Sequence, residues 1–435
     1  MHRYKFVTGC IIAFFLINVC NTTFGQEIWA AYSQKLDVKK YEGRRFRLNA
    51  AVRTEGTDDS SASMLWARVD KVSGQGFFNN MRDRPVRARE WKTYSIEGTI
   101  DTGATQIAFG ALCAYNGKFY FDDFKVEIET QKGKWTNIFV DDFENGSLKF
   151  QPGIGIDTFG INHLFKAELL AGSRKPGPRS LVISADKVHL FGNDKRVGKF
   201  ANVNGIRLYY EIYGSGAPLL VLHGNGGSIE SAGVFYNELM KKYKVIAVDS
   251  RAQGKSTDTE APLTYDQMAS DVNALLEELK IDSAYIWGQS DGAILGLLLA
   301  KDYPSKVKKV VAFGSNIQQD SLALFPWAIT AMEKLVKESK DPVERKLNQL
   351  MLDYPKIPYT DLASIKAPVL VVAGDRDVIR PEHSLKIFQH IPNSQMCIIP
   401  GATHGAAWEK HALFLQIIED FFDKPFTMPD TKSWF

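Results

Sequence analysis

A short glycine- and serine-containing stretch constrains the fold of this chain more than any other feature. The residues just before Ser290 are apolar enough for a buried strand, and residues 293–300 are apolar enough for a buried helix. Between them lies Gly288-Gln289-Ser290-Asp291-Gly292. A strand that turns directly into a helix strains its middle residue, so the positions two before and two after it must be small. The pattern predicts that Ser290 stands at a sharp turn beside helix amides that favour an anion.

Length and composition indicate a globular chain with more than one domain. The 435 residues suffice for two or three domains, and 24% charged with 45% hydrophobic residues is ordinary for such proteins. The net charge of +3 gives no reason to expect nucleic-acid binding. No apolar run in the body of the chain is long enough to span a bilayer.

The first 25 residues have the pattern of a signal peptide. A basic start and an apolar stretch at 6–19 precede small residues ahead of a plausible cleavage site before Gln26. We therefore expect export to the periplasm or the medium. Lipoprotein anchoring at Cys20 is the alternative, but the two residues before this cysteine are not the small pair that such signals carry.

The cysteines predict neither a disulfide framework nor a metal site. Cys10 and Cys20 would leave with the signal peptide, whereas Cys113 and Cys397 fall in different predicted domains. We expect no metal and no organic cofactor.

Residues 26–130 have the alternating pattern of a β-sandwich. Short stretches of alternating apolar and polar residues are separated by turn residues, and they cover 45–53, 63–70, 91–100, 106–113 and 119–128. The stretches around Trp91, Phe109 and Phe121 resemble the jelly-roll sandwiches of carbohydrate-binding modules and galactose-binding-like domains.

This resemblance implies possible carbohydrate binding through the N-terminal domain. Aromatic side chains that could stack on sugar rings are Trp66, Phe77, Phe78 and Tyr115. The alternative is that these rings pack in the core or at its edge, and that the domain has a structural or docking role.

Residues 131–198 are rich in proline and glycine, which favours a connector between domains. A short helical pattern lies near 163–170, and no task can be assigned to this segment from its sequence.

From residue 199 onward, apolar strands alternate with helical patterns, which is typical of a mostly parallel sheet covered on both faces. A hairpin at 199–212 turns at Asn204-Gly205, and a helix is predicted over 265–279 with Thr264 as its cap. Apolar residues at helical spacing over 316–362 interrupt the alternation and predict a helical insertion.

The motifs of this region resemble those of the α/β-hydrolase family over residues 199–422. They are His223-Gly224-Asn225-Gly226-Gly227, Asp249-Ser250-Arg251-Ala252-Gln253-Gly254, the serine turn, Gly374-Asp375-Arg376-Asp377 and Gly401-Ala402-Thr403-His404. The resemblance implies that the insertion at 316–362 forms a cap over the site. Ala252 departs from the pattern, since relatives usually carry glycine there, and we expect it only to stiffen that loop.

The predicted chemistry is nucleophilic catalysis. A serine hydroxyl is a poor nucleophile at neutral pH and needs a positioned base, and His404 has a suitable pKa range. A carboxylate must orient that histidine. Asp377 is our choice because the family pattern places the acid there, and Asp375 is the alternative.

An oxyanion would form during such a reaction and would need backbone donors. The amides of Asn225 and Asp291 are the predicted oxyanion hole, whereas His223 is expected to be structural.

Asp291 is also a candidate substrate-binding residue. A carboxylate directly after the nucleophile disfavours an anionic transition state unless it is turned away or paired. It could cap the helix or pair with a cation such as Arg251. Alternatively, it binds a positive group on the substrate, because the Ser-Asp-Gly turn with Asn225 is similar to the valacyclovirase-like amino-acid-ester hydrolases, where that aspartate has such a role.

The sequence therefore predicts an exported serine hydrolase that cleaves an ester bond through an acyl-enzyme. Aminopeptidase or amidase, lactonase and haloperoxidase-like activities are alternatives on the same scaffold. A non-catalytic protein that binds a glycan or another partner is an alternative of a different class, but the complete set of serine, acid and base argues against it.

Overall fold

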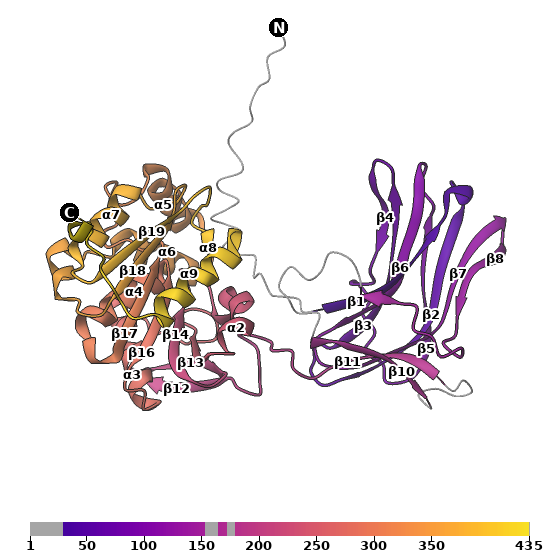
Figure 1. The fold of residues 1–435 in the computed structure, drawn as a ribbon, viewed down its shortest axis with the longest axis horizontal. Coiled ribbons are helices and arrows are strands. Elements are labelled where there is room, and N and C mark those ends of the chain that lie inside the picture. Colours follow the sequence, from indigo (N-terminus) through magenta and orange to yellow (C-terminus); the bar gives the residue numbers. More distant parts are fainter. Residues whose placement is uncertain (1–28, 153–163, 172–178, 435) are drawn as a thin grey trace, which may run out of the picture. The chain divides into compact units, whose positions relative to one another are not determined.

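The chain folds into two compact units, Glu27–Leu190 and Phe191–Phe435. The structure is a computed structural model, and it describes residues 29–152, 164–171 and 179–434 (Figure 1). The predicted signal peptide and the lipoprotein alternative at Cys20 lie outside the described residues.

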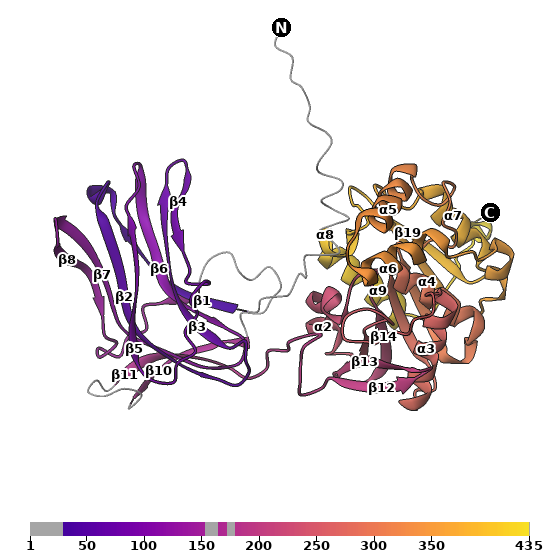
Figure 2. The same cartoon turned by 180° about the vertical axis from the view of Figure 1, so that it is seen from behind.

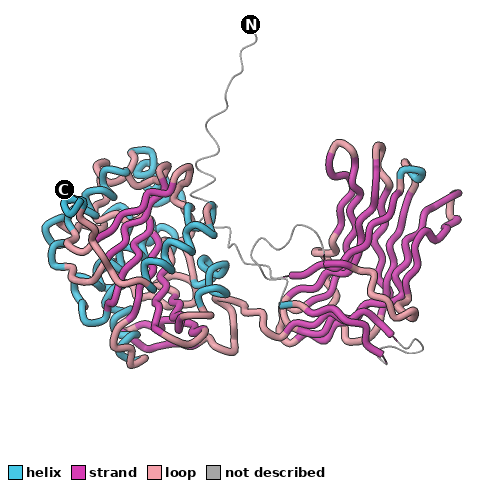
Figure 3. The backbone as a smooth tube through the Cα atoms, viewed as in Figure 1, coloured by secondary structure: helices cyan, strands magenta, loops and turns pink. Residues whose placement is uncertain are grey.

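The first unit is a β-sandwich of two antiparallel sheets, as predicted (Figure 3). One sheet has the order β4-β3-β6-β1-β9, and the other has the order β10-β11-β7-β2-β5, with β8 paired to β7. The bounds are β1 Trp29–Asp37, β2 Arg45–Gly56, β3 Ala62–Lys71, β4 Gly74–Asn79, β5 Lys92–Thr99, β6 Ala104–Ala114, β7 Gly117–Gln131, β8 Lys134–Asp141, β9 Gln151–Pro152, β10 Lys166–Ala171 and β11 Arg179–Ala185.

Alternation along the strands builds the core between these sheets. On β2, Phe46 and Leu48 are fully buried, while Arg45 and Arg47 lie on the other face. The core is rich in phenylalanine, and Phe109 of one sheet and Phe121 of the other belong to the same buried cluster.

Of the four aromatic residues predicted as sugar contacts, three pack partly buried against this core: Trp66, Phe77 and Tyr115. Phe78 is 50% exposed, which leaves it as the one of the four with an open ring face.

The prediction of a connector over residues 131–198 is wrong. Strands β8, β10 and β11 lie in this range and extend the β7 sheet on one side, and residues 166–171 form a strand instead of the predicted helix. Apolar residues in β11, including Leu181 and Ile183, enter the sandwich core. Pairing with neighbouring strands, of β8 and β11 with β7 and of β10 with β11, thus outweighed the proline- and glycine-rich flanks.

The second unit contains an eight-stranded sheet with the order β12-β13-β15-β14-β16-β17-β18-β19 (Figure 2). The strands are β12 Lys199–Val203, β13 Ile206–Tyr213, β14 Ala217–Leu222, β15 Tyr243–Val248, β16 Ala284–Gln289, β17 Val307–Phe313, β18 Val369–Gly374 and β19 Ser394–Ile399. The first two form the predicted hairpin, β13 pairs antiparallel with β15, and the pairs from β15 to β19 are parallel.

Helices cover both faces of this sheet. The helices are α2 Gly233–Leu239, α3 Tyr265–Glu278, α4 Asp291–Asp302, α5 Pro326–Glu338, α6 Pro342–Asp353, α7 Pro381–His390, α8 Ala406–Glu409 and α9 His411–Asp423. Residues of α3, α4 and α7 form one buried cluster with alternate strand residues, and residues of α2 and α9 form another with the intervening strand residues. Thr264 caps α3 as predicted, since its side chain accepts a hydrogen bond from the Gln267 amide at 3.1 Å.

The predicted insertion at 316–362 contains α5 and α6, which pack differently. On α6, Leu347 and Leu350 belong to the main cluster of the sheet, whereas Met332 of α5 lies in a small separate cluster with Leu324 and Ile379. The second half of the insertion is therefore continuous with the core.

Among the described residues, no helix combines the length and hydropathy needed to cross a bilayer. Within the same residues, no group of three or more histidine, cysteine or acidic side chains is arranged to hold a metal ion.

Candidate active site

Ser290 occupies a strained turn between β16 and α4, as predicted. Its backbone has φ 51° and ψ −116°, a conformation that costs a non-glycine residue free energy. A Cβ atom at Gly288 would lie 2.1 Å from the Gly292 carbonyl oxygen, and one at Gly292 would lie 2.1 Å from the Leu222 carbonyl oxygen. Both flanking glycines are thus needed for the turn to close.

His404 and Asp377 meet at the carboxyl ends of β18 and β19. The distance from His404 Nδ1 to Asp377 Oδ1 is 2.7 Å, and the Ile379 amide donates to the same oxygen at 3.0 Å. The Asp377 carboxyl group is fully buried, while the His404 side chain is 24% exposed. Burial alone would lower the pKa of His404, but the carboxylates of Asp377 and Asp291 outweigh it and raise this pKa.

Residues 313 and 314, at the end of β17, bring Ser290 and His404 to the same place. The Ser290 amide donates to the Phe313 carbonyl oxygen at 2.8 Å. Gly314 has φ +62°, and a Cβ atom there would lie 2.7 Å from His404 Cε1. The imidazole therefore lies against Gly314, directly beside the backbone that holds the serine.

Asp375 has a different environment from Asp377. Its Oδ1 accepts a hydrogen bond from the Ala402 amide at 3.2 Å. Backbone amides of Gly401 and Ala402 lower its pKa. Asp375 thus holds the loop that carries His404, whereas Asp377 contacts the imidazole itself.

Asp291 is buried and bound by two neutral donors. Asn225 Nδ2 donates to Oδ2 at 2.9 Å, and the Tyr265 hydroxyl donates to Oδ1 at 2.9 Å. Burial raises its pKa to about 6, and these hydrogen bonds and His404 limit the rise. Pairing with Arg251, one of the predicted alternatives, is wrong, because Arg251 forms a buried salt bridge with Asp271 at 2.7 Å.

The two predicted oxyanion donors lie after different strands, Asn225 in the turn after β14 and Asp291 at the start of α4 after β16. Among the described residues, the backbone N–H groups of Asn225 and Asp291 have no hydrogen-bond acceptor. By contrast, the Gly226 amide donates to Gln253 Oε1 at 2.6 Å. His223 is structural as predicted, since its Nε2 accepts from the Ser250 amide at 3.0 Å within the buried interior.

Two site residues escaped the sequence analysis. Tyr265 was recognised only as the start of a helix, and nothing in its surroundings signals that its hydroxyl reaches Asp291. Gly314 could have been found as a glycine directly after an apolar strand.

Ala252 was expected only to stiffen its loop, but its φ of 66° also places it in the left-handed region that favours glycine.

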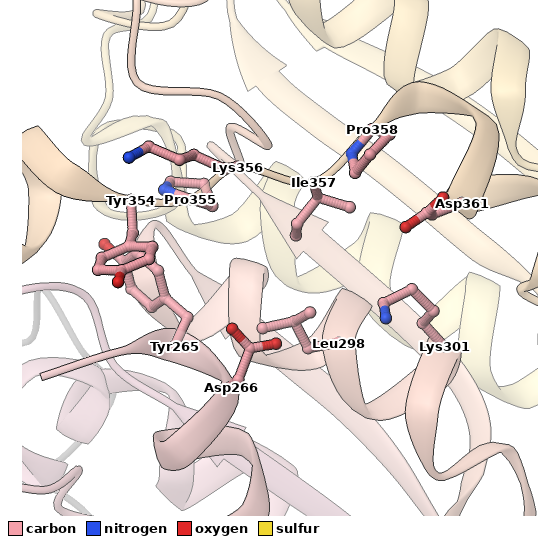
Figure 4. Close-up of a pocket in the computed structure, with 10 residues that line it drawn as sticks. All are labelled: Tyr265, Asp266, Leu298, Lys301, Tyr354, Pro355, Lys356, Ile357, Pro358 and Asp361. Carbon is pink, nitrogen blue, oxygen red and sulfur yellow. The ribbon is translucent and has the colours of Figure 1, made fainter.

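A cavity of about 190 Å³ lies between α3, α4 and the segment that follows α6 (Figure 4). Tyr265 lines it together with Leu298 of α4 and the segment from Tyr354 to Pro358. Its charged lining residues are of both signs, Asp266, Lys301, Lys356 and Asp361. Ser290 and His404 do not line this cavity.

Comparisons with known proteins found a matching family model and several similar proteins. Residues 217–362 match the model of the family described as alpha/beta hydrolase fold. The human serine hydrolase BPHL is 28% identical over 291 residues, covering 61% of this chain and 99% of the human protein. The 2-hydroxy-6-oxononadienedioate/2-hydroxy-6-oxononatrienedioate hydrolase of Comamonas testosteroni is 25% identical, covering 53% and 97%. The enol-lactonase from Burkholderia xenovorans LB400 aligns with a TM-score of 0.45 at 19% identity, covering 52% and 100%.

The sheet order, the strained serine turn and the family match define the class of the second unit. It has the α/β-hydrolase fold, preceded in the chain by a β-sandwich. The full-length relatives that it resembles are hydrolases, and we assign this chain to the hydrolases.

Proposed function

We propose that this protein is a serine hydrolase that cleaves a carboxylic ester through an acyl-enzyme. The observation that carries the proposal is the pairing of His404 with the buried Asp377 beside a serine in a strained turn. Ser290 is the nucleophile, His404 the base and Asp377 the group that orients His404.

Each bond and proton in the proposed reaction is accounted for by the ester, water and these residues. Ser290 Oγ bonds to the ester carbonyl carbon while His404 takes its proton, and the resulting oxyanion accepts hydrogen bonds from the amides of Asn225 and Asp291. The C–O bond to the alcohol then breaks as His404 returns the proton to the leaving oxygen. In the second half, water bonds to the acyl carbon while His404 takes its proton. The bond from that carbon to Ser290 Oγ then breaks as His404 returns the proton to Oγ, which releases the acid.

The substrate class follows from Asp291. Asp291 lies next to the nucleophile and is buried. Both of its hydrogen-bond donors among the described side chains, Asn225 and Tyr265, are neutral, so no side-chain cation among them neutralises its negative charge. We infer that this charge binds a protonated amino group, and that the preferred substrates are α-amino esters.

The remaining parts of the proposal concern location and the sandwich. The basic and apolar pattern of the first 25 residues supports export to the periplasm or the medium. Exposure of Phe78 supports a carbohydrate contact on the sandwich.

The test is covalent labelling followed by kinetics. A fluorophosphonate should label the wild type at Ser290 and leave Ser290→Ala unlabelled. Loss of ester hydrolysis in this variant should reach roughly a million-fold, because the nucleophile and its base act as a unit. Valine esters should react faster than N-acetylvaline esters. Retention of more than a few per cent of activity in Ser290→Ala would refute the assignment, and equal rates on the two esters would refute the role of Asp291.

A further inference from the structure

The side chain of Asn225 connects two parts of the hydrolase unit that are far apart in sequence. Its Nδ2 atom donates to Asp291 Oδ2 at 2.9 Å and to the Leu347 carbonyl oxygen at 3.2 Å. An amide nitrogen carries two hydrogens, so both donors are used. Asp291 begins α4 at the serine turn, and Leu347 lies in α6 of the insertion at 316–362, the segment that the family resemblance predicts to be a cap.

The same residue carries one of the proposed oxyanion donors. The Asn225 backbone N–H has no acceptor among the described residues, while the next amide, of Gly226, is held by Gln253. The direction of the Asn225 N–H therefore depends on two restraints, the Gly226 hydrogen bond on one side and the Asn225 side chain on the other. Only the second of these reaches the cap.

The other end of this connection is packed in the core of the hydrolase unit. Leu347 is 5% exposed and packs in the main core cluster with Leu350. Its carbonyl oxygen lies in the interior of α6, where it also serves the helix hydrogen bond to residue 351. A shift of α6 would therefore move the acceptor of Asn225 Nδ2 directly.

We propose that the Asn225 side chain is a positioning residue that couples the seating of cap helix α6 to the alignment of the Asn225 backbone N–H in the oxyanion hole. The inference rests on the proposed function and deepens it. A substrate that binds against α6 would thereby orient the Asn225 N–H toward its own transition state. Because such coupling is reciprocal, an oxyanion bound in the site would also hold α6 in place.

Asn225→Ala is the informative variant, because it keeps the backbone N–H and removes only the side-chain connection. Tyr265→Phe is the matched control, since it removes the other hydrogen bond to Asp291 and keeps the hydrogen bond between Asn225 and the Leu347 carbonyl oxygen. Hydrogen exchange of the peptide covering residues 343–353 is measured in each full-length protein, free and after labelling of Ser290 with a fluorophosphonate. A peptide covering 307–313 reports that the fold is intact.

In the wild type, labelling should slow exchange in residues 343–353, on the order of two- to tenfold as expected for one coupled hydrogen bond. This protection should persist in Tyr265→Phe and disappear in Asn225→Ala. The alanine variant should also lose kcat on a small soluble ester with little change in KM. Asn225→Leu, which keeps about the size, adds no charge and lacks both N–H donors, repeats the test if the alanine variant does not fold.

Two results would overturn the inference alone: labelled wild type without protection of α6, or protection that survives in Asn225→Ala. Either would mean that the packing of Leu347 and Leu350 alone seats the cap. Failure of the probe to react at Ser290 would overturn the proposed function, and this inference with it.

Discussion

In the sandwich, arginine side chains lie against aromatic rings along the faces of strands that point away from the core, whereas in the hydrolase unit the reactive residues gather where strands end. Arg47 of β2 lies 4.5 Å from the centre of the Trp135 ring, and Arg53 lies 3.9 Å from that of Tyr120. Ser290 follows β16, and Asp377 follows β18 by a short loop. Side chains along a strand point alternately into the core and toward the surface, so they are spread over both faces of a sheet. Residues that follow parallel strands converge on one edge of the sheet.

This difference explains how much could be predicted. The serine turn was predictable, because steric reasons require glycine at 288 and 292. The His404–Asp377 pair and the order of apolar strands were predictable too, because an acid and a base must follow successive strands. The sandwich strands with clear alternation were predictable for the same kind of reason. Strands β10 and β11 were not, because the pairing of β11 with β7 and of β10 with β11, and not their own sequence, decides their structure.

The surroundings of Asp291 mark the limit of sequence analysis within the hydrolase unit. Charge alone suggested Arg251 as its partner, yet Arg251 binds Asp271 on α3. The actual partners, Asn225 and Tyr265, are 66 and 26 residues away and neutral. A neutral hydrogen-bond donor cannot be recognised from a sequence pattern, because the residue type of a tyrosine or asparagine does not indicate which acceptor it binds.

The largest expected loss of activity that tests this difference between the two units comes from substituting the two aspartates after β18. Asp377→Asn should lower kcat on a soluble ester by about 10⁴-fold, because the amide would favour the wrong tautomer of His404. Asp375→Asn is the control, since Asp375 bonds only to the loop backbone, and it should cost less than about tenfold. Steady-state kinetics decide the matter, and the reverse ranking would transfer the role to Asp375.

A second prediction concerns where the hydrolase unit begins. Residue 199 is the predicted start, but Phe191 contacts Tyr213 at 4.9 Å between ring centres, and the amides of Gly192 and Asp194 donate to the buried Glu211 carboxyl group. A fragment of residues 191–435 should therefore be more stable to urea than one of 199–435 by at least about 3 kcal/mol, because the shorter fragment loses apolar burial and two hydrogen bonds to the buried Glu211 carboxyl group.

The longer fragment should keep the small-ester activity of the full chain, because the proposed catalytic groups all lie within it. Equal urea midpoints for the two fragments would restore the boundary at 199. Loss of small-ester activity in a well-folded 191–435 fragment would show that the sandwich completes the site.

The smallest expected effect is the pH dependence of substrate preference. Burial raises the pKa of Asp291 to about 6, so its carboxylate is charged above this pH and neutral below it. The ratio of kcat/KM for a valine ester to that for its N-acetyl analogue should therefore fall roughly tenfold between pH 7 and pH 5. Titration of His404 affects both esters alike and cancels in the ratio. In Asp291→Asn the ratio should be close to one and independent of pH. A ratio that stays constant in the wild type over this range would show that the charge of Asp291 does not select the substrate, and would leave this carboxyl group with the structural role of joining Asn225 to Tyr265 beneath the serine turn.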